Sequence, residues 1–418
     1  MKLSGSEKQY RIVDDEIRAF QFVRNRCLRF WMDGIKVTLA QINAYATKIR
    51  KNKEFPWAGK LTSSSAQAAS ERAMIAVRRF YDNCKAGIPG KKGYPKFQRD
   101  NRSAEFKVDG WRLSADRKHI TFTDGFKAGA FALVGSSELQ FYHERAIKRV
   151  RIVRRADGYY CQFVVAVERN IKTEVTGRSI GIDVGLEKFY TDSEGSSISN
   201  PRYLRKAEKS LKRSQRRVSK KFKKPEKKGE KVRQSNNYKK ACNRLGRRHL
   251  KIQRQRVDFA RKTARALVQS CDLVAYEDLR VKNMVRNHKL AKSISDVGWR
   301  LFLNWVDRYG LLFRKPVIAV PPQYTSQNCS GCGTQVKKSL SVRTHVCPSC
   351  KLVMDRDGNA ARNILEKGLS IAALLTSTVG HTETLNAWGD LTNTLGIEKC
   401  SGQVGSKNQE SPAINVSA

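Results

Sequence analysis

Near its C-terminus the chain reads Cys329-Ser330-Gly331-Cys332, then, after fourteen residues, Cys347-Pro348-Ser349-Cys350, and soon afterwards Asp355-Arg356-Asp357-Gly358-Asn359. Four thiolates in two Cys-x2-Cys pairs are typical ligands of a tetrahedral Zn²⁺ ion, which holds a loop in place. Aspartates in a polar segment instead favour Mg²⁺, which commonly works on phosphate groups. Two metals with different tasks in one short segment indicate an enzyme that acts on nucleic acid.

The cysteine set predicts one structural zinc ion. Its central gap is one residue shorter than the usual gap of about fifteen to twenty residues in such ribbons. All four positions are cysteine, so the ion keeps no open coordination site and should position the segment that carries Asp357 rather than perform chemistry. His345 is an alternative ligand, although we expect it to be a surface histidine.

Composition and charge limit the function further. At 418 residues the chain can form roughly two or three domains with their own cores. Its formal net charge of +44 and its pI near 10.2 make nucleic acid the expected partner. No run of about 18 apolar residues and no signal-peptide core are present, which argues against a membrane protein. We therefore expect a cytoplasmic, nucleoid-associated prokaryotic protein.

The remaining cysteines are scattered singly through the chain. This pattern is typical of ordinary buried thiols in a reducing compartment rather than of a disulfide framework. These residues are Cys27, Cys84, Cys161, Cys242, Cys271 and Cys400.

Residues 10–86 show helical periodicity, with apolar side chains three to five residues apart. The stretch from Gly87 to Lys96 then combines Gly and Pro with lysines, which indicates a basic loop. It lacks the spacing of a phosphate-binding P-loop. Its candidate nucleic-acid contacts are Lys91, Lys92 and Lys96, and the nearby aromatic residues Trp57, Tyr94 and Phe97 either stack on unpaired bases or belong to the core.

Residues 104–170 have the texture of short β-strands. Alternating apolar residues on both sides of Ala156-Asp157-Gly158 predict a hairpin, and the region as a whole predicts a small barrel or sheet. Its basic residues either follow a phosphate backbone or form a solvated sheet face. They are Arg112, Lys118, Lys148, Arg149, Arg151, Arg154 and Arg155.

Residues 201–270 carry 27 Lys or Arg against 4 Asp or Glu, just over half of the net charge. Apolar residues from Val257 to Val268 predict a docked helix with a cationic outer face, whereas the front half, including Lys220–Pro225, is expected to be mobile. Candidate nucleic-acid contacts here are Arg213, Arg216, Arg217, Arg247 and Arg248. Residues 367–418 lose the basic excess, and we expect a poorly ordered tail.

Three acidic residues follow strand-like or metal-binding segments. Asp183 follows Ile180 and Ile182, and Glu277 ends the apolar run that begins at Leu273. The third acid is either Asp355 or Asp357, and the other one caps the helix that begins near Asn359. Carboxylates brought together from distant segments can hold two Mg²⁺ ions beside a phosphodiester, so we expect Asp183, Glu277 and one of these two aspartates to converge.

Four ordered motifs then resemble the split RuvC nuclease motifs and zinc finger of the TnpB family, which comprises transposon-encoded RNA-guided DNA endonucleases related to compact type V CRISPR effectors. The resemblance covers most of residues 10–366. The motifs are Gly181–Gly185, Tyr276–Leu279, Thr325–Gly333 and Asp355–Ile364, with further similarity at Gly93–Phe97 and Ser293–Trp299.

The resemblance implies an α/β RNase H-like (RuvC) core with a zinc-ribbon insertion, plus an N-terminal helical recognition lobe and an oligonucleotide-binding β-barrel. It makes Asp183, Glu277 and Asp357 the catalytic ligands of two Mg²⁺ ions, and it places Arg356 and Arg362 beside the scissile strand. Family members usually open with a barrel strand, which we expect to be missing here because the chain is helical soon after Met1.

The implied domain order can be written along the chain. Residues 1–90 would form the helical lobe, 91–175 the barrel, 176–324 the nuclease core with its basic insertion at 201–270, 325–352 the zinc finger, 353–366 the end of the core and 367–418 the tail.

The expected function is an RNA-guided DNA endonuclease that binds a structured guide RNA and target double-stranded DNA. A compact type V CRISPR effector with the same chemistry and a non-cleaving RNA-guided DNA-binding protein are the alternatives. Gly181–Gly185 also resembles the first phosphate loop of actin-like ATPases, but no further Gly-rich phosphate loop follows residue 270.

Overall fold

The structure is a computed structural model that describes residues 1–34, 36–88, 90–135, 137–167, 171, 173–226, 232–339 and 342–378. The described residues up to 167 form one compact unit and those from 171 onward form a second. None of the helices in these ranges is long and apolar enough to span a lipid bilayer. The finer domain boundaries expected from the sequence stay a prediction.

The first unit combines helices with an antiparallel sheet. Its helices are α1 (Glu7–Asp33), α2 (Leu39–Lys51), α3 (Pro56–Gly59) and α4 (Ser63–Lys85), with two 3-10 helices, η1 (Ser137–Phe141) and η2 (Glu144–Ala146). Its strands are β1 (Lys2–Ser4), β2 (Ser103–Phe106), β3 (Trp111–Leu113), β4 (His119–Phe122), β5 (Gly129–Val134), β6 (Ile147–Arg155) and β7 (Gly158–Val165).

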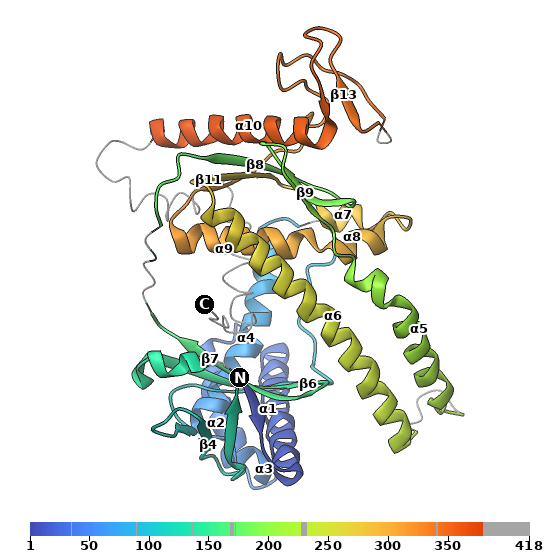
Figure 1. Ribbon diagram of the computed structural model, residues 1–418. Helices are drawn as coiled ribbons and strands as arrows, with labels where there is room; N and C mark the ends of the chain where they lie inside the picture. The colour runs from blue at the N-terminus through green and yellow to red at the C-terminus, as the bar shows by residue number, and fades with distance from the viewer. Residues whose placement is uncertain are drawn as a thin grey trace. The chain divides into compact units, whose positions relative to one another are not determined.

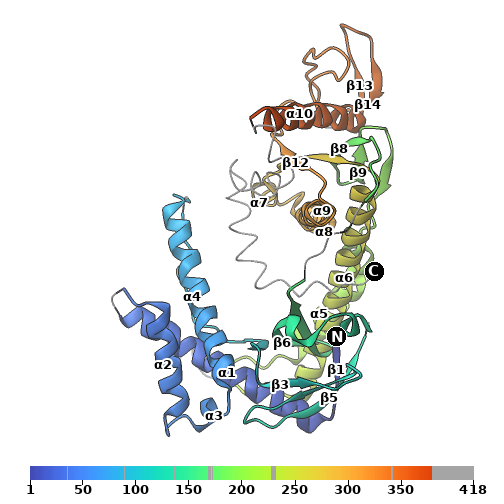
Figure 2. The same cartoon turned by 90° about the vertical axis from the view of Figure 1, so that its left-hand side faces the viewer.

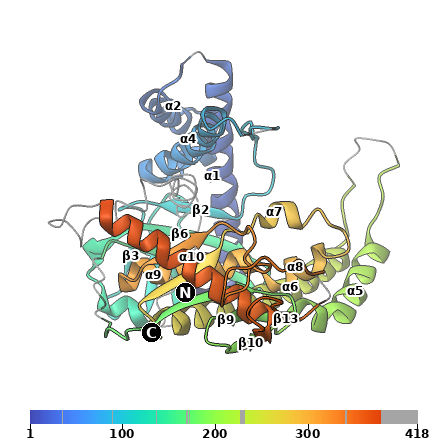
Figure 3. The ribbon, with the colours of Figure 1, turned by 90° about the horizontal axis from the view of Figure 1, so that it is seen from above.

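The helical periodicity of residues 10–86 is confirmed. Capping boxes at Ser6 and Thr38 start α1 and α2 by satisfying backbone N–H groups that have no partner within the helix. Both α1 and α2 pack against α4, and Figure 3 shows the three helices gathered together. Buried residues such as Phe20 and Val23 in α1 and Ala69 in α4 share one core with Phe106 and Phe131 of the sheet. Helices and sheet of this unit therefore stabilise each other.

The seven strands follow the order β2-β6-β7-β1-β5-β4-β3. The expectation that the opening strand is missing is wrong, because Lys2–Ser4 form β1, which pairs with β5 and β7 in the middle of the sheet. The strand is only three residues long and buries a single apolar side chain, Leu3. A pattern so short has no detectable alternation. The hairpin predicted around Ala156-Asp157 is confirmed as β6 and β7.

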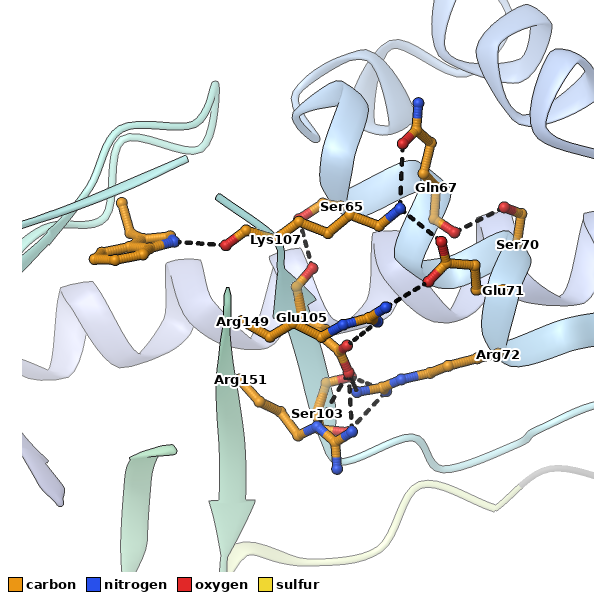
Figure 4. A network of polar contacts seen from close by, with 11 residues as sticks. Ser65, Gln67, Ser70, Glu71, Arg72, Ser103, Glu105, Lys107, Arg149 and Arg151 are labelled. Atoms are coloured by element: carbon orange, nitrogen blue, oxygen red, sulfur yellow. Dashed lines mark hydrogen bonds and ion pairs between the residues drawn. The ribbon is translucent and has the colours of Figure 1, made fainter. Parts of the chain in front are cut away.

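A buried ion network joins α4 to the sheet of the first unit (Figure 4). Glu105 on β2 pairs with Arg72 of α4 at 2.7 Å and with Arg149 and Arg151 of β6 at 2.8 and 2.9 Å. Glu71 of α4 pairs with the same Arg149 at 3.1 Å. The prediction of a phosphate-tracking or solvated face therefore fails for Arg149 and Arg151, because their guanidinium groups form ion pairs with carboxylates of the same unit.

Some of the other basic residues of this region have partners within the unit, and others are exposed. Arg154 pairs with Asp14 of α1 and with Asp100, each at 3.0 Å. Arg155 lies over the ring of Tyr160. Exposed positions available to nucleic acid are Arg112, Lys118 and Lys148.

The second unit contains a five-stranded sheet, a small hairpin and long helices. Its strands are β8 (Ser179–Val184), β9 (Lys188–Asp192), β10 (Ser197–Ser199), β11 (Leu273–Glu277), β12 (Val317–Val320), β13 (Thr344–Val346) and β14 (Val353–Asp355). Its helices are α5 (Tyr203–Lys221), α6 (Asn236–Gln269), α7 (Val281–Met284), α8 (Ala291–Val297), α9 (Trp299–Phe313) and α10 (Arg356–Thr378).

The main sheet has the order β10-β9-β8-β11-β12. Strands β8, β11 and β12 are parallel, whereas β9 and β10 are antiparallel additions to one edge. Figures 1 and 2 show α10 across one face of this sheet and α6 and α9 on the opposite face. The side chains agree, because Ile182 and Tyr276 share a core with α6 and α9, whereas Ala275 packs with Ile364 of α10. The sheet is therefore buried on both faces, as parallel strands require.

Two expectations about order along the chain need correction. The basic tract was expected to be mobile in its front half, yet residues 203–221 form α5, whose buried stripe at Leu211, Ser214 and Val218 lies on the helix that packs against α6. The tail was expected to start at residue 367, yet α10 continues to Thr378 because Ile371 packs against the sheet core. Residues 379–418 lie outside the described residues, so the remaining tail prediction is untested.

Candidate metal centres

Two of the predicted acids lie on adjacent parallel strands. Ile182 of β8 pairs with Tyr276 of β11, so Asp183 and Glu277 each stand one residue further along strands about 4.8 Å apart. Side chains alternate between the faces of a strand. Because Ile182 and Tyr276 point toward α6 and α9, Asp183 and Glu277 point to the face that α10 covers.

Helix α10 reaches this face through an unusually close approach to the sheet. A Cβ atom on Gly181 of β8 would lie 2.2 Å from the carbonyl oxygen of Ala361, and one on Gly368 of α10 would lie 2.5 Å from Cβ of Ala275. Only glycine at these two positions lets the helix lie directly on β8 and β11. Asp357 in the first turn of α10 is thereby brought to the end of the sheet that carries Asp183.

The charges of Glu277 and Asp357 act on Asp183. Burial raises the pKa of Asp183 well above its ordinary value, and the nearby charges of Glu277 and Asp357 raise it further. Burial also raises the pKa of Glu277, partly offset by a hydrogen bond from the Thr325 hydroxyl and by the charge of Lys367. Carboxylates whose ionisation is this costly favour a nearby cation. The donor set therefore fits a hard divalent ion.

The sequence leaves open which of Asp355 and Asp357 caps the helix and which is the third candidate metal ligand. The hydrogen bonds of Asp355 favour the capping role for that residue. Asp355 precedes the first residue of α10, and its Oδ1 accepts the backbone N–H groups of Asp357 at 2.8 Å and Gly358 at 3.2 Å. It also pairs with Lys188 at 3.1 Å. Partial burial would raise its pKa, but these bonds outweigh burial and lower it. Asp355 is thus the helix cap.

Asp357 is held by arginines. Arg356 pairs with its Oδ1 at 3.0 Å, and Arg343 lies 3.8 Å from its Oδ2. The side chain of Arg356 is 15% exposed, and its guanidinium group contacts Asp357, so its predicted contact with nucleic acid stays a prediction. The guanidinium groups of Arg356 and Arg343 balance the negative charge of Asp357.

The four cysteines converge as predicted. Their sulfur atoms lie within 4.8 Å of one another, and no other group of three or more potential ligand residues does so within the described ranges. Contacts with the hydroxyl and backbone of Thr334 lower the pKa of Cys332 to about 6. For Cys350 the backbone contact with Leu352 is outweighed by hydrogen bonds with Cys329 and Cys332, which raise its pKa to about 12. Such crowding of sulfurs fits a soft cation that replaces the shared protons.

Two asparagines that the sequence analysis missed tie the cysteine segment to α10. Asn359 accepts the backbone N–H of Ser330 at 2.9 Å and donates to the carbonyl of Asn328 at 2.7 Å. Asn363, one turn later, donates to the carbonyls of Thr325 and Asn328. Their side chains are almost fully buried, so the contacts fix the zinc segment on the helix that carries Asp357. Two asparagines four residues apart among alanines were the available signal.

His345 does not lie on the surface, contrary to expectation. It is fully buried on β13 opposite Met354 of β14, and its Nδ1 contacts the amine of Lys338. Burial lowers its pKa, and the charge of Lys338 acts in the same direction. The thiol predictions fail similarly for Cys84, which is exposed, and for Cys242, which is partly exposed. Cys400 lies outside the described residues.

The remaining candidates for nucleic-acid contact fall into three groups. The candidates on α5 and α6 are all exposed; they are Arg213, Arg216, Arg217, Arg247 and Arg248. In the first unit Lys91 and Lys96 are exposed, whereas Lys92 donates to the carbonyl of Ile88 within its own loop. Arg362 is exposed on α10 and donates to the carbonyl of Ser193 at 3.4 Å. Trp57, Tyr94 and Phe97 are 44%, 53% and 45% exposed, so the core interpretation of them is wrong.

Comparisons with known proteins agree with this arrangement. The family model OrfB_IS605, described as "Probable transposase", matches residues 162–288, which include β8 and β11 with Asp183 and Glu277. A second model, "Cas12f1-like, TNB domain", matches residues 299–364, which include the cysteine set and Asp357.

Individual relatives extend the similarity over most of the chain. A Streptomyces pristinaespiralis protein named "Putative RNA-guided DNA endonuclease" is 28% identical over 347 residues, which cover 81% of this chain and 79% of that protein. A relative from Escherichia coli, "Putative RNA-guided DNA endonuclease InsQ", is 26% identical over 68% of this chain and 70% of its own. The mimivirus "TnpB-like protein L770" is 26% identical and matches over 52% of its length.

A solved structure shows the same fold. The "Cas12f1-sgRNA-target DNA complex" superposes with a TM-score of 0.52 over 86% of this chain and 83% of that one, at 14% identity. The chain therefore shares the fold of that protein. The resemblance to the TnpB family that the four motifs indicated is confirmed by the family models and by the relatives.

Proposed function

We propose that this protein is an RNA-guided DNA endonuclease whose five-stranded sheet is an RNase H-like (RuvC) core. The observation that carries this proposal is the placement of Asp183 and Glu277 on the sheet face that α10 covers, with Asp357 in the first turn of that helix. The relatives named as RNA-guided endonucleases and the fold shared with Cas12f1 support it.

Asp183, Glu277 and Asp357 would together hold two Mg²⁺ ions. When bound, such a pair of ions activates the attacking water and stabilises the leaving 3′ oxygen of the phosphodiester. The protein's own contribution is to fix the carboxylates: paired strands set Asp183 and Glu277, the cap at Asp355 orients the first turn of α10, and Thr325 donates to Glu277. Exposed Arg362 could neutralise phosphate charge on a bound strand.

Cys329, Cys332, Cys347 and Cys350 would hold one structural Zn²⁺ ion. The segment around this ion is bonded to α10 through Asn359 and Asn363, so zinc would preserve the position of the first turn of that helix. Zinc chemistry itself is not needed at the phosphodiester, because the four thiolates would complete the coordination of the ion.

A structured guide RNA and target double-stranded DNA would be the partners. Sequence choice would then rest on base pairing, and the protein would supply phosphate contacts, which suits a net charge of +44. Binding of these partners would keep the protein in the prokaryotic cytoplasm, at the nucleoid. A CRISPR-associated effector of the same chemistry is a second candidate, since the second family model is of a Cas12f1-like domain. A non-cleaving RNA-guided DNA-binding protein is a third.

The test is to sequence the RNA that copurifies with the protein and then to supply a plasmid that matches its guide portion. Cleavage of the matching plasmid in Mg²⁺, absent with a scrambled target or with chelator, is the expected result. RNA derived from flanking transposon sequence favours the transposon origin, and repeat-spacer RNA favours a CRISPR origin. Guided binding without any cut would favour the non-cleaving protein.

A further inference from the structure

An aromatic cluster lies on the surface of the first unit. Trp31 at the end of α1 lies 6.2 Å from Tyr81 of α4 and 5.9 Å from Tyr94 of the following loop, measured between ring centroids. Phe80 of α4 lies 5.5 Å from Tyr81 and 5.3 Å from Tyr94. These four residues, Trp31, Phe80, Tyr81 and Tyr94, form a closed circuit of rings, which we call the aromatic platform.

The two tyrosines of the platform are half exposed, and each contacts the less accessible rings of Trp31 and Phe80. Tyr81 is 50% exposed and Tyr94 is 53% exposed, whereas Trp31 and Phe80 are only partly accessible. Large aromatic side chains normally bury most of their surface. Two half-exposed tyrosines that contact the same two rings offer aromatic surface to planar ligands.

The loop that carries Tyr94 is fastened to the helices. Arg24 of α1 donates to the carbonyl of Lys96 at 2.8 Å, and Asn83 of α4 donates to the carbonyl of Lys92 at 2.9 Å. Asn25 and Gln98 exchange two further hydrogen bonds at 2.8 and 2.9 Å. Because the loop is bonded on both sides of Tyr94, the ring is held in position before any ligand arrives, which reduces the entropic cost of binding.

Exposed cations lie on the same helix and loop as the two tyrosines of the platform. The helix α4 contributes Arg78, Arg79 and Lys85, and the loop contributes Lys91 and Lys96. None of these five forms an ion pair with an acidic residue within the described ranges. By contrast, Arg72, which lies earlier in α4, pairs with Glu105. The acids nearest in sequence to the platform residues are Asp33, which pairs with Arg29, and Asp82, which follows Tyr81 directly.

We propose that the aromatic platform binds unpaired nucleotides of an RNA strand by stacking them on Tyr81 and Tyr94 while the surrounding cations contact the phosphates. Aromatic faces accept any base, and unpaired loops of a structured RNA can present splayed bases to them. An apolar surface of this kind is best covered by a partner that stays bound. Under the proposed function, on which this inference rests, that partner is the guide RNA rather than a DNA strand that leaves after cleavage.

The test uses the full-length protein freed of copurifying RNA and a fluorescent oligouridylate of about 12 nucleotides as the probe. Replacing both tyrosines by leucine (Tyr81→Leu with Tyr94→Leu) keeps apolar packing against Trp31 but removes the rings. Stacking contributes about 1–3 kcal/mol per base, so the double variant should bind the oligonucleotide at least roughly tenfold more weakly. Tyr94→Phe, which keeps the ring, should bind as the wild type does.

Two matched controls separate stacking from general effects. Phe141→Leu changes an aromatic residue of the same unit that is 76% exposed and lies outside the platform, and it should leave binding unchanged. Duplex RNA should lose little affinity in the double variant, because paired bases cannot stack on the rings. Unchanged thermal unfolding confirms that a variant is folded, and Tyr81→Phe with Tyr94→Leu replaces the double variant if that protein does not fold.

Three outcomes overturn the proposal: equal binding of oligouridylate by the wild type and the leucine variant, equal loss for duplex RNA, or loss confined to single-stranded DNA. Failure of the proposed function is distinguishable from these outcomes. It would show as an absence of guided cleavage by the wild type, whatever the platform binds. Conversely, guided cleavage together with wild-type oligouridylate binding in the leucine variant refutes the platform alone.

Discussion

Asp183 on β8 and Glu277 on β11 occupy matching positions on adjacent parallel strands, each one residue beyond the paired residues Ile182 and Tyr276. This register turns both carboxylates toward α10 and brings Asp183 near Glu277 and Asp357. A slip of one residue in either strand would send one carboxylate to the opposite face, into the core that α6 and α9 share. The candidate site therefore depends on strand pairing as much as on the acids.

Asp355 and Asp357 should respond differently to the same substitution. Asp357→Asn removes a charge that the two-metal proposal requires, so guided cleavage should fall at least about a hundredfold, or about 3 kcal/mol. Asp355→Asn should keep most activity, because asparagine also caps helices well. Cleavage rates under single-turnover conditions check both variants. A larger loss in Asp355→Asn than in Asp357→Asn would reverse the assignment.

Gly181→Ala should displace α10. The added methyl group would meet the carbonyl oxygen of Ala361 at 2.2 Å and the backbone nitrogen of Leu365 at 2.6 Å, and neither atom can move without the helix. Overpacking of this kind costs about 1–3 kcal/mol, so both the unfolding temperature and the cleavage rate should fall.

The matched variant is Gly358→Ala in the first turn of α10. Its added Cβ meets nothing closer than the terminal carbon of Met354, at 3.5 Å, so stability should be unchanged or slightly higher. Equal effects of the two alanine substitutions in differential scanning fluorimetry would show that the close helix–sheet approach is unimportant.

Cys347→Ser should remove zinc and weaken cleavage without touching the carboxylates. A serine hydroxyl is a poor ligand for zinc, so bound metal measured by mass spectrometry should fall from about one ion per chain to near zero. The loosened segment would no longer hold Asn359 and Asn363, and cleavage should drop with it. Cys84→Ser changes an exposed cysteine of the other unit and should retain both zinc and activity. Full zinc content in Cys347→Ser would contradict the four-cysteine site.

Glu105 should make the first unit sensitive to acid. Burial alone would raise its pKa, but Arg72, Arg151 and Arg149 outweigh burial and lower it from 4.5 to about 2. A carboxyl group whose pKa is lower in the folded state adds stability above its unfolded pKa and loses this contribution as the pH falls toward its folded pKa. The expected contribution is about 3 kcal/mol, lost between pH of about 4.5 and about 2.

Hydrogen exchange of peptides from β2 and β6, followed as the pH is lowered, measures this loss in the intact chain. Glu105→Gln should flatten the pH dependence and lower stability at neutral pH, because three arginines lose their carboxylate. Glu194→Gln, which removes an exposed partner of Arg178, should change little. Glu16 and Asp124 oppose the trend, since burial raises the pKa of both groups. An unchanged pH profile in Glu105→Gln would contradict the role of the network.

Residues with a chemical signature were identified from the sequence alone. The sulfur atoms of the two Cys-x2-Cys pairs lie close together, as predicted. The apolar runs before Asp183 and Glu277 form adjacent strands. The hairpin at β6 and β7 was predictable because its alternation spans many residues on both sides of a short turn. Patterns that repeat within one element can be detected without knowledge of the tertiary fold.

Features that depend on distant partners were not predictable. Strand β1 exists because β5 and β7 flank it, and Lys2–Ser4 carry no pattern of their own. Arg149 and Arg151 resemble surface cations until Glu105 is brought beside them. His345 is buried because β14 and Lys338 cover it, which no local signal indicates. Sequence spacing could not show which of Asp355 and Asp357 caps the helix, whereas the hydrogen bonds of Asp355 to the first turn of α10 do.

The most direct test of the account compares guided DNA cleavage and RNA binding in Asp183→Ala and Glu277→Ala. Each change removes one carboxylate from the proposed metal cluster and leaves the basic surface of α5 and α6 intact. Both variants should bind the copurifying RNA as tightly as the wild type and should cut matching DNA at least about a hundredfold more slowly. Cleavage at the wild-type rate by either variant would show that the acids at the ends of β8 and β11 are not the hydrolytic centre.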